Sequence, residues 1–375
     1  MRATDVAIVG GGIMGCAVAF QMTRLGFTDV VVLEKGKLAG GATGVCPGGI
    51  RQQFETEPDC MLARHSMVQF WNQVNEILEP EMPFIFERSG YLFLAESEDV
   101  LAQFRKNVAT QNRVGIPSRI LGPSEVRTIV PELLLEGVIG GAFCGEDGFL
   151  EDCHGVTNAL ATRARERGAR VVYAEVRELR RSAGGWELVT ADDSLQAKRV
   201  VLAAGADSVP LAAGAGVRLP IVAENRRLAY TAPYGPTVMQ PLVIALERGF
   251  AGKQLRGGVF YFGWLQETGA ADDLTFMEKG LEAGLSVWPG FEDLPVRRVS
   301  TGVYDQTPDH RPILGPAGAD GLYLAVGFSG HGFMIAPAVA EMVAAQVLGL
   351  ATTLPASDFT LGRFATMSGK EGLYI

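Results

Sequence analysis

The chain has 375 residues, of which 47% are hydrophobic and 20% charged, and its formal net charge is −9. This length exceeds what one ordinary hydrophobic core supports, so we expect two interleaved domains. The acidic balance argues against a nucleic-acid partner or an anionic membrane surface. No apolar run reaches membrane-spanning length, the first strand begins too early for a signal peptide, and the five cysteines form no C-x-x-C pair. We therefore expect a cytoplasmic protein with reduced thiols, without a transmembrane segment and without a metal site.

The first predicted element is a buried strand at 6–9, reading VAIV. Three glycines follow it in G-x-G-x-x-G spacing: Gly10, Gly12 and Gly15. An amphipathic helix pattern begins at Ile13, and a second strand over 30–33 ends at Glu34. In this arrangement the glycines allow a tight turn, close approach of a pyrophosphate and close helix–strand packing. The helix start binds phosphates and the acid binds ribose hydroxyls, so the stretch predicts a dinucleotide-binding βαβ unit.

A glycine-rich stretch follows at 35–54 and reads KGKLAGGATGVCPGGIRQQF. We expect an irregular loop here, because so many glycines disfavour a helix. One interpretation is a surface loop. The other is a segment wrapped against a flat ligand, where larger side chains would collide. Arg51 is the only cation in the second half of the stretch, and helical periodicity then predicts a helix over 59–78.

Hydrophobic periodicity locates the remaining elements. Helices are predicted at 98–111, 156–167, 274–285 and 336–348. Strands are predicted at 90–97, 138–143, 170–175, 176–182, 186–190, 199–204, 227–232, 242–246, 258–263, 299–304 and 322–326. We assign to the nucleotide-binding domain the residues 1–84, 146–217 and 296–375. We assign to a second domain, with an antiparallel sheet, the residues 85–145 and 218–295.

Five motifs stand in the order found in one family of flavoproteins: GGGIMG, the GATG…GGIRQQF loop, AAGA, TPDHRPILG and GFSGHGFMIAP. With them the chain resembles, over essentially its full length, the D-amino-acid-oxidase-type flavoproteins. Within this family it is similar to the group of sarcosine oxidase, glycine oxidase, dimethylglycine dehydrogenase and the proline dehydrogenase β subunit. The resemblance implies FAD as cofactor and an α/β fold. It also implies a Rossmann-like FAD-binding domain with a central parallel sheet, interleaved with an α+β substrate domain on a large, mostly antiparallel sheet.

By position in these motifs, the resemblance implies which residues contact FAD. The ADP half is expected at Gly10, Gly12, Gly15, Glu34, Lys35, Val176, Ala204 and Gly205. The phosphates and flavin are expected at Ala42, Thr43 and Gly44, and the isoalloxazine at Gly327, Ser329, Gly330, His331, Gly332 and Phe333. The expected cofactor site is completed by Ile13, Met14, Gly49, Ile50, Gly302 and Met334. Reduced flavin gathers negative charge, which backbone N–H groups at a helix start can stabilise.

Two departures from the family pattern concern attachment of the flavin. Relatives that tether it through a histidine carry that residue in the GATG loop, where this chain has Val45 and Cys46. Relatives that tether it through a cysteine carry that residue just before the TPD motif, where this chain has Gly302. We therefore expect non-covalent FAD, with attachment to Cys46 as the alternative.

Other departures concern the substrate. Monomeric sarcosine oxidases have one lysine where this chain has Met334, and a second, which assists oxygen, where it has Tyr261. Glycine oxidases have an arginine where Tyr304 or Gly330 stands. The resemblance therefore leaves open which amine or amino acid is oxidised. It also leaves open whether O2 or another acceptor takes the electrons.

The expected catalytic residues are Arg51, Tyr261 and His331. Arg51 is expected to hold a substrate carboxylate, because a guanidinium binds carboxylates in a bidentate fashion. The alternative is a structural arginine that ties down its loop. Tyr261 is expected either to steer substrate or oxygen, or to pack in the core of its sheet. His331 is expected at the flavin, with a loop-capping histidine as the alternative.

The main hypothesis is therefore FAD-dependent oxidation of a small amino acid or N-methyl amino acid that is sarcosine-, glycine- or proline-like. Hydride transfer to flavin N5 would give an imine that hydrolyses. One alternative is a β-type subunit that passes electrons to partner chains. Another is a flavin-bearing assembly protein without turnover. A nicotinamide-dependent dehydrogenase is more remote, and the sequence leaves open whether the chain forms a homo-oligomer.

Overall fold

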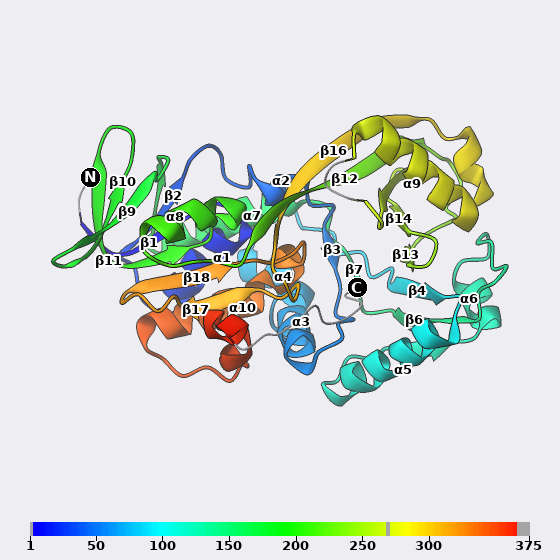
Figure 1. Ribbon diagram of the computed structural model, residues 1–375, viewed down its shortest axis with the longest axis horizontal. Helices are drawn as coiled ribbons and strands as arrows, with labels where there is room; N and C mark the ends of the chain where they lie inside the picture. Colours follow the sequence, from blue (N-terminus) through cyan, green and yellow to red (C-terminus); the bar gives the residue numbers. More distant parts are fainter. Residues whose placement is uncertain (1–2, 268–270, 366–375) are drawn as a thin grey trace.

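A computed structural model describes residues 3–267 and 271–365 (Figure 1). These residues form two eight-stranded sheets and one two-stranded sheet, with helices packed on both large sheets. The long strands β12 (Val222–Pro233) and β16 (Val296–Gln306) run side by side and reach α9 (Asp273–Val287) at the upper right of Figure 1. The two sheets with their helices confirm the predicted α/β fold class.

The first sheet has the strand order β17-β18-β11-β1-β2-β8, and β10 and β9 continue from β11. Its strands are β1 (Thr4–Val9), β2 (Val30–Glu34), β8 (Arg170–Tyr173), β9 (Glu178–Ser182), β10 (Gly185–Val189), β11 (Ser194–Leu202), β17 (Ile313–Pro316) and β18 (Leu322–Val326). The pairs β1–β11, β1–β2, β2–β8 and β11–β18 are parallel. Along β1, Val6 and Ile8 are buried on one face, and Ala7 and Val9 on the other. Burial on both faces explains the continuous apolar sequence of this strand.

Helix α1 (Ile13–Arg24) packs on this sheet together with α7 (Cys153–Glu166) and α10 (Gly332–Leu348). α3 (Glu57–Gln69) packs in turn on α10. The shorter helices of this part are α4 (Val74–Leu78), α8 (Ser208–Gly214), η1 (Trp71–Gln73), η2 (Gly205–Asp207), η4 (Ala356–Phe359) and η5 (Leu361–Ala365). Within 3–267 and 271–365, none of the helices combines the length and the apolar character needed to cross a membrane.

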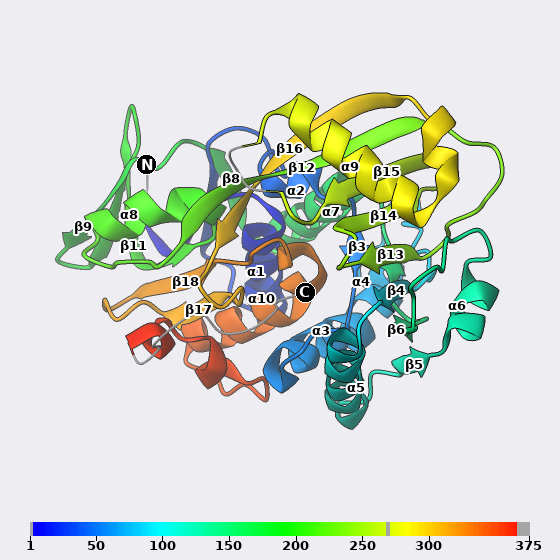
Figure 2. The ribbon, with the colours of Figure 1, turned by 45° about the vertical axis from the view of Figure 1, so that its right-hand side comes forward.

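The second sheet has the order β16-β12-β15-β14-β13-β4-β6-β5. Its remaining strands are β4 (Tyr91–Ala95), β5 (Arg119–Leu121), β6 (Gly140–Cys144), β13 (Leu242–Ala245), β14 (Phe250–Gln254) and β15 (Val259–Trp264). Its pairs are antiparallel except β4–β13. Figure 2 shows α9 lying across β14 and β15, and α6 (Pro123–Ile129) and η3 (Pro289–Asp293) border the same core. α5 (Glu98–Arg113) packs on the opposite face, which also carries Tyr91, Phe93 and Tyr261.

The two-stranded sheet pairs β3 (Gly49–Ile50) with β7 (Gly148–Phe149). Figure 1 shows these strands near the centre of the view, next to α3 and β4. β3 follows directly on the helical turn α2 (Ala42–Val45), and β7 continues from β6 through a short turn. This small sheet therefore connects the glycine-rich stretch at 35–54 to the second large sheet.

Some predicted elements differ from those observed. The predicted helix over 59–78 is interrupted at Phe70, where φ is −135°, because the rings of Phe70 and Trp71 both turn into the core. The stretch that we expected to be non-helical contains α2, closed by the bond from the Gly44 N–H to the Gly41 carbonyl oxygen. Short elements were also missed, since their burial comes from tertiary contacts: α6, α8, β5, β14 and β17.

The predicted domain boundary between 295 and 296 falls at the start of β16. This strand pairs with β12 along the second sheet, from Val296 to Gln306. Residues 296–306, which we assigned to the nucleotide-binding domain, therefore extend the second sheet, because a strand belongs to the sheet whose backbone groups it pairs with. The division of the whole chain into two domains stays a prediction.

Candidate functional site

The turn between β1 and α1 leaves no room for side chains on two of its glycines. Gly10 has a φ of +112°, and a Cβ there would lie 2.4 Å from the Ala203 carbonyl oxygen. A Cβ on Gly15 would lie 1.9 Å from the Gly10 carbonyl oxygen. Gly12 is the N-cap of α1 and adds no capping side chain, which suits a helix start that receives phosphate oxygens. This cradle fits the pyrophosphate of FAD.

Glu34 ends β2 beside this turn, and its carboxylate binds two backbone amides. Oε2 accepts a hydrogen bond from the Gly11 N–H at 2.7 Å, and Oε1 accepts one from the Gly36 N–H at 2.8 Å. The two oxygens of a carboxylate offer about four lone-pair sites, so acceptor capacity remains for ribose hydroxyls. Lys35 donates to Asp207 at 2.6 Å, and this bond raises the pKa of the lysine. Lys35 therefore links the end of β2 to η2.

Helical turn α2 closes over the start of α1. The Thr43 hydroxyl accepts a hydrogen bond from the Ile13 N–H at 3.1 Å. Because this bond uses the first amide of α1, we expect phosphate contacts from the amides that follow, beginning at Met14. A Cβ on Gly302 would lie 2.8 Å from a methyl group of Val45, so β16 touches α2 at this glycine. The structure thus brings the start of α1, the GATG loop and Gly302 together.

Other predicted cofactor residues lie on several neighbouring elements. Val176 is buried in the apolar cluster under β1 and β2. The Ala204 N–H donates to the Ser208 hydroxyl at 3.1 Å, and Gly205 begins η2 with a φ of +55°. Gly49 and Ile50 form β3, and Ala42 and Gly44 form α2 with Thr43. As contacts of FAD, all of these residues stay predictions.

The turn before α10 is held by Asp305, a buried carboxylate that the sequence analysis did not single out. Its oxygens accept hydrogen bonds from the Gly327 N–H at 2.6 Å and the Phe328 N–H at 3.0 Å. Ser329 follows with a φ of +50°, and its hydroxyl accepts a bond from the Thr307 N–H at 3.2 Å. The only sequence signal for Asp305 is its position at the end of a strand, directly before the motif QTPDH.

The end of the same motif turns partly into the core. The ring of Phe333 lies 5.0 Å from that of Trp71, whose Nε1–H donates to the Met334 carbonyl oxygen at 2.7 Å. Both Phe333 and Met334 are buried in the cluster around α1 and α10, so we expect any contact with FAD through their backbone. Gly330, with a φ of +89°, packs against the ring of Tyr304, and Gly332 begins α10.

Arg51 and His331 lie 280 positions apart in the sequence, and the structure brings their side chains together. Arg51 Nη2 lies 3.0 Å from His331 Nε2. A guanidinium only donates, so this nitrogen is the acceptor and the imidazole proton belongs on Nδ1. Burial and the charge of Arg51 lower the pKa of His331 to about 3, so the imidazole is neutral at physiological pH. The Arg51 side chain itself is only 5% exposed.

Aromatic rings surround the Arg51–His331 pair. The Arg51 guanidinium carbon lies 4.6 Å from the ring centroid of Phe54 and 5.6 Å from that of Phe93. The Phe54 ring meets the His331 ring edge-on at 5.2 Å. A cation above aromatic faces is stabilised by the negative faces of the rings. The site therefore holds its positive charge in largely apolar surroundings.

Tyr261 continues this aromatic lining on the second sheet. Its ring lies 5.9 Å from Phe149, which stacks on Tyr91 at 5.5 Å. Tyr261 is 3% exposed, and within the described residues its hydroxyl has no hydrogen-bond partner. Burial raises its pKa well above the ordinary value, so it remains a neutral phenol. An unpartnered buried hydroxyl is costly, and a bound ligand is one means of satisfying it.

A lysine does lie beside Tyr261, one strand further along the sheet. Lys253 on β14 is paired with Tyr261 on β15 and is completely buried. Its Nζ donates to the Ser89 hydroxyl at 3.0 Å and to the Gln240 carbonyl oxygen, and it lies 5.1 Å from the ring of Phe149. Burial lowers the pKa of this lysine. Phe149 thus contacts both Lys253 and Tyr261, and the ammonium group is engaged with neighbouring loops.

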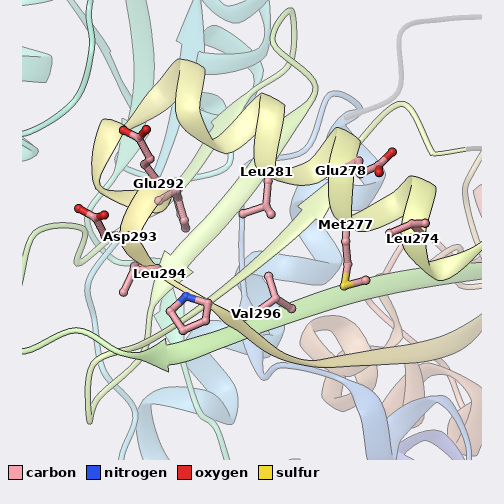
Figure 3. A pocket seen from close by; sticks show the side chains of 10 residues that line it. Leu274, Met277, Glu278, Leu281, Glu292, Asp293, Leu294 and Val296 are labelled. Carbon is pink, nitrogen blue, oxygen red and sulfur yellow. The ribbon is translucent and has the colours of Figure 1, made fainter.

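A separate pocket of about 470 Å³ lies between α9 and the start of β16 (Figure 3). Figure 3 shows Met277 and Leu281 pointing from α9 toward the segment that carries Val296. The carboxylates of Glu278 on α9 and Glu292 on η3 also border the pocket. None of the predicted site residues lines this pocket. We therefore place the candidate active site at Arg51 and Tyr261 and not here.

Comparison with known proteins identifies the family of the chain. Residues 5–346 match the family model described as "DAO: FAD dependent oxidoreductase". The chain belongs to this FAD-dependent oxidoreductase family. It is therefore a flavoenzyme with FAD as its cofactor, which confirms the predicted family, cofactor and enzyme class.

Three relatives illustrate the match. The chain is 30% identical to "FAD-dependent oxidoreductase domain-containing protein 1" of Bos taurus, over 96% of this chain and 85% of that protein. It is 28% identical to sarcosine oxidase subunit beta of Rhodobacter capsulatus, over 99% of this chain and 90% of that protein. The crystal structure of L-proline dehydrogenase from P. horikoshii is 30% identical, with a TM-score of 0.90, and 97% of this chain and 98% of that chain are covered.

Proposed function

We propose that this flavoenzyme oxidises the C–N bond of a small amino acid or N-methyl amino acid with a sarcosine-, glycine- or proline-like structure. The observation that carries the proposal is the buried guanidinium of Arg51, held between aromatic faces and bonded to a neutral imidazole. The planar guanidinium can bind both oxygens of a substrate carboxylate, and its aromatic surroundings suit a small ligand. The relatives support the same chemistry, since two of them are named sarcosine oxidase and L-proline dehydrogenase.

In this proposal Arg51 binds and orients the substrate. Its planar fork matches the two oxygens of a carboxylate. His331 accepts a hydrogen bond from one end of the fork and so fixes the plane of the guanidinium. Because the imidazole stays neutral, it neither adds charge nor competes for the carboxylate. With the carboxylate held, the position of the substrate α-carbon is restricted, and such positioning is the main requirement of this reaction.

The remaining roles follow from the surroundings. When bound, FAD accepts the hydride equivalent from the substrate carbon. The cradle at the start of α1, Glu34, the turn α2 and the turn held by Asp305 are proposed to hold it. Tyr261 offers its hydroxyl, which has no partner among residues 3–267 and 271–365, to the substrate or to oxygen as a neutral hydrogen-bond donor. The substrate must arrive as the free amine, and the imine product hydrolyses in water.

We propose that FAD is bound without a covalent link. Val45 and Cys46 end α2 where tethered relatives have a histidine, and Gly302 occupies the other tethering position. Acid or heat denaturation should therefore release FAD into the supernatant. Flavin that stays with the precipitated protein would contradict the proposal, and a peptide containing Cys46 would be examined first.

One second candidate rests on the relatives. The Rhodobacter capsulatus relative is named as a β subunit, so this chain is also a candidate for the catalytic subunit of a larger assembly that passes electrons on. In that case reduced flavin would transfer its electrons to a dye or partner chain faster than to O2. The measured mass of the purified protein, together with this comparison of acceptors, separates the two candidates.

The experiment that tests the proposed function is an anaerobic screen. Sarcosine, glycine, N,N-dimethylglycine and L-proline are added separately to the purified holoprotein, and the absorbance of oxidised flavin is followed. We expect at least one of them to bleach the flavin, and Arg51→Ala to slow the bleaching by that substrate. If no amino acid or N-methyl amino acid reduces the flavin, the proposed function is wrong, and a flavin-bearing assembly protein becomes the better interpretation.

A further inference from the structure

Asp147 lies in the turn between β6 and β7, beside the segment that carries Arg51. It is completely buried, and both of its carboxylate oxygens are hydrogen-bonded. Oδ1 accepts bonds from the Gln52 N–H at 2.9 Å and the Gln52 Nε2 at 3.3 Å. Oδ2 accepts a bond from the Gln53 Nε2 at 3.0 Å. Asp147 therefore binds the two residues that directly follow Arg51.

The same contacts fasten this segment to the second sheet. The Gln53 Nε2 also donates to the Tyr91 carbonyl oxygen of β4 at 3.0 Å. The Gly90 N–H, just before β4, donates to the Asp147 carbonyl oxygen at 2.8 Å. On the other side of Arg51, Ile50 pairs with Gly148 in the small sheet. Arg51 is thus anchored immediately before and immediately after its own position.

The charge of Asp147 is part of this anchor. Burial raises the pKa of Asp147 to about 6, and the bonds from Gln53 and Gln52 and the charge of Arg51 oppose that rise. A neutral asparagine has the same shape, but its amide would place a donor against Gln52 or Gln53, both of which already donate. The hydrogen bonds of Gln52 and Gln53 therefore favour the ionised carboxylate over a neutral group, whereas burial favours the neutral form, which is why the pKa is raised.

We infer that Asp147 is the positioning residue that holds the Arg51 guanidinium in place for the substrate carboxylate. This inference rests on the proposed function of Arg51. Asp147 acts through Gln52 and Gln53 and touches neither substrate nor cofactor. A purely electrostatic role would have the opposite sign, because removing a negative charge near Arg51 strengthens the attraction of an anion. Binding of a carboxylate therefore distinguishes positioning from electrostatics.

The test measures binding of acetate and cyclopentanecarboxylate, which cannot be oxidised at a C–N bond, to the oxidised holoenzyme. Their Kd is read from the change in flavin absorbance. We expect Asp147→Asn to raise the Kd about ten- to hundredfold, the effect of displacing a binding group by roughly 1 Å. An unchanged or lower Kd in Asp147→Asn overturns the inference.

The pH dependence gives a second readout that a merely structural role would not change. Both probe carboxylates stay ionised above pH ~5.5, so changes above this pH report the protein. In the wild type we expect Kd to rise as pH falls through about 6, because Asp147 then loses its charge. In Asp147→Asn we expect no such change between pH ~5.5 and ~8. A curve that is the same in both proteins, or a wild-type Kd that falls with pH, contradicts positioning by Asp147.

Other titratable groups face Asp147 from the neighbouring elements. They are Arg51 beyond β3, Tyr91 on β4 and Cys144 on β6. In addition, Arg64 on α3 donates hydrogen bonds to the Gln52 side chain and to Glu146. Burial raises the pKa of Cys144 to about 12, and it also raises the pKa of Tyr91 well above the ordinary value of tyrosine. Neither group titrates in the tested range, and the pKa of His331 is too low to contribute.

Three further variants complete the test. Gln53→Met keeps Asp147 and removes the bonds to Asp147 and Tyr91, so it should also raise Kd if Asp147→Asn does not fold. Asp309→Asn, which removes a buried carboxylate paired with Arg363, is the matched control and should leave Kd unchanged. If Arg51→Ala leaves Kd unchanged, the proposed function fails. If Arg51→Ala raises Kd while Asp147→Asn and Gln53→Met do not, only the inference on Asp147 fails.

Discussion

Replacing Arg51 by alanine tests the proposed carboxylate site most directly. The side chain is 5% exposed, and its guanidinium lies against Phe54 and bonds His331. Truncating one partner of a buried, hydrogen-bonded charge pair costs about 2–5 kcal/mol. With about 1.4 kcal/mol for each factor of ten, kcat/KM for an amino acid should fall by roughly 30- to several-thousand-fold. FAD content should not change, because Arg51 is assigned to the substrate.

The assay compares each amino acid with the amine that lacks its carboxylate, such as sarcosine with dimethylamine and L-proline with pyrrolidine. The slow turnover of the amine should be nearly the same in Arg51→Ala and in the wild type. Arg51→Lys should recover only part of the activity, because an ammonium group cannot reproduce the planar fork. If the amino acid and the amine lose activity equally, Arg51 supports the loop or the flavin, and the reasoning is refuted.

A matched control separates lost packing from lost recognition. Arg311 is also a largely buried arginine, paired with Asp59 at 2.9 Å and stacked on Phe359 at 4.8 Å. Arg311→Ala should lower the melting temperature without changing the ratio of amino-acid to amine turnover. A change in that ratio would mean that general loosening of the protein mimics the effect, and that the loss seen in Arg51→Ala says nothing about a carboxylate.

The remaining predictions concern the cofactor, the pH and oxygen. Glu34→Gln should raise the Kd of FAD roughly 10- to 150-fold, since one hydrogen bond to a charged group contributes ~1.5–3 kcal/mol. The kcat at saturating FAD should stay the same. An unchanged affinity for FAD would show that Glu34 does not bind the cofactor. The wild type should lose stability relative to Asp147→Asn as pH rises from about 4 to about 6. Burial raises the pKa of Asp147 from 3.8 to about 6, so in this interval the native state binds more protons than the unfolded state. A constant difference between the melting temperatures of the two proteins across this interval would contradict the prediction. His331 has the opposite sign: its pKa is lowered from 6.5 to about 3, so the wild type should lose stability relative to His331→Gln as pH falls from about 6.5 to about 3. Reduced enzyme should react slowly with air, since Phe149 lies against the Lys253 ammonium and Ser89 binds it. Rapid production of hydrogen peroxide that persists in Lys253→Met would contradict this expectation and would identify Arg51 as the cation that assists oxygen.

Local sequence patterns were sufficient for the nucleotide-binding unit. Gly10, Gly15 and Glu34 lie within one βαβ segment, and each requirement on them is set by neighbours a few residues away. The turn at Gly10 needs a positive φ, and Gly15 needs close helix packing, so residue type alone indicates the geometry. The family motifs added the cofactor, because five of them occur in order along the chain.

Long-range pairing was not predictable in the same way. Arg51 and His331 were each singled out, yet nothing in either motif indicates that Nη2 of one meets Nε2 of the other. Asp147 was missed for the same reason, since C-G-E-D-G-F resembles an ordinary acidic turn. Its burial depends on how β6, β7 and the segment after β3 come together. Lys253 was missed because its strand β14 was not predicted and because lysine is seldom buried, whereas this one is completely buried beside Phe149.

The position of Arg51 indicates why the proposed carboxylate site needs both large sheets. Before Arg51, Ile50 pairs with Gly148 in the small sheet, and after Arg51, Gln53 bonds Tyr91 on β4 of the second sheet. The Arg51 side chain bonds His331, which is the N-cap of α10 and therefore belongs to the helices packed on the first sheet. The backbone of Arg51 is thus held on the side of the second sheet, and its guanidinium is bonded to a residue on the side of the first sheet. The orientation of the side chain therefore depends on the relative placement of the two sheets. If Arg51 binds the substrate as proposed, substrate recognition and the alignment of the two sheets are coupled through this one side chain. A loss at either anchor should then weaken carboxylate binding before it affects the binding of FAD.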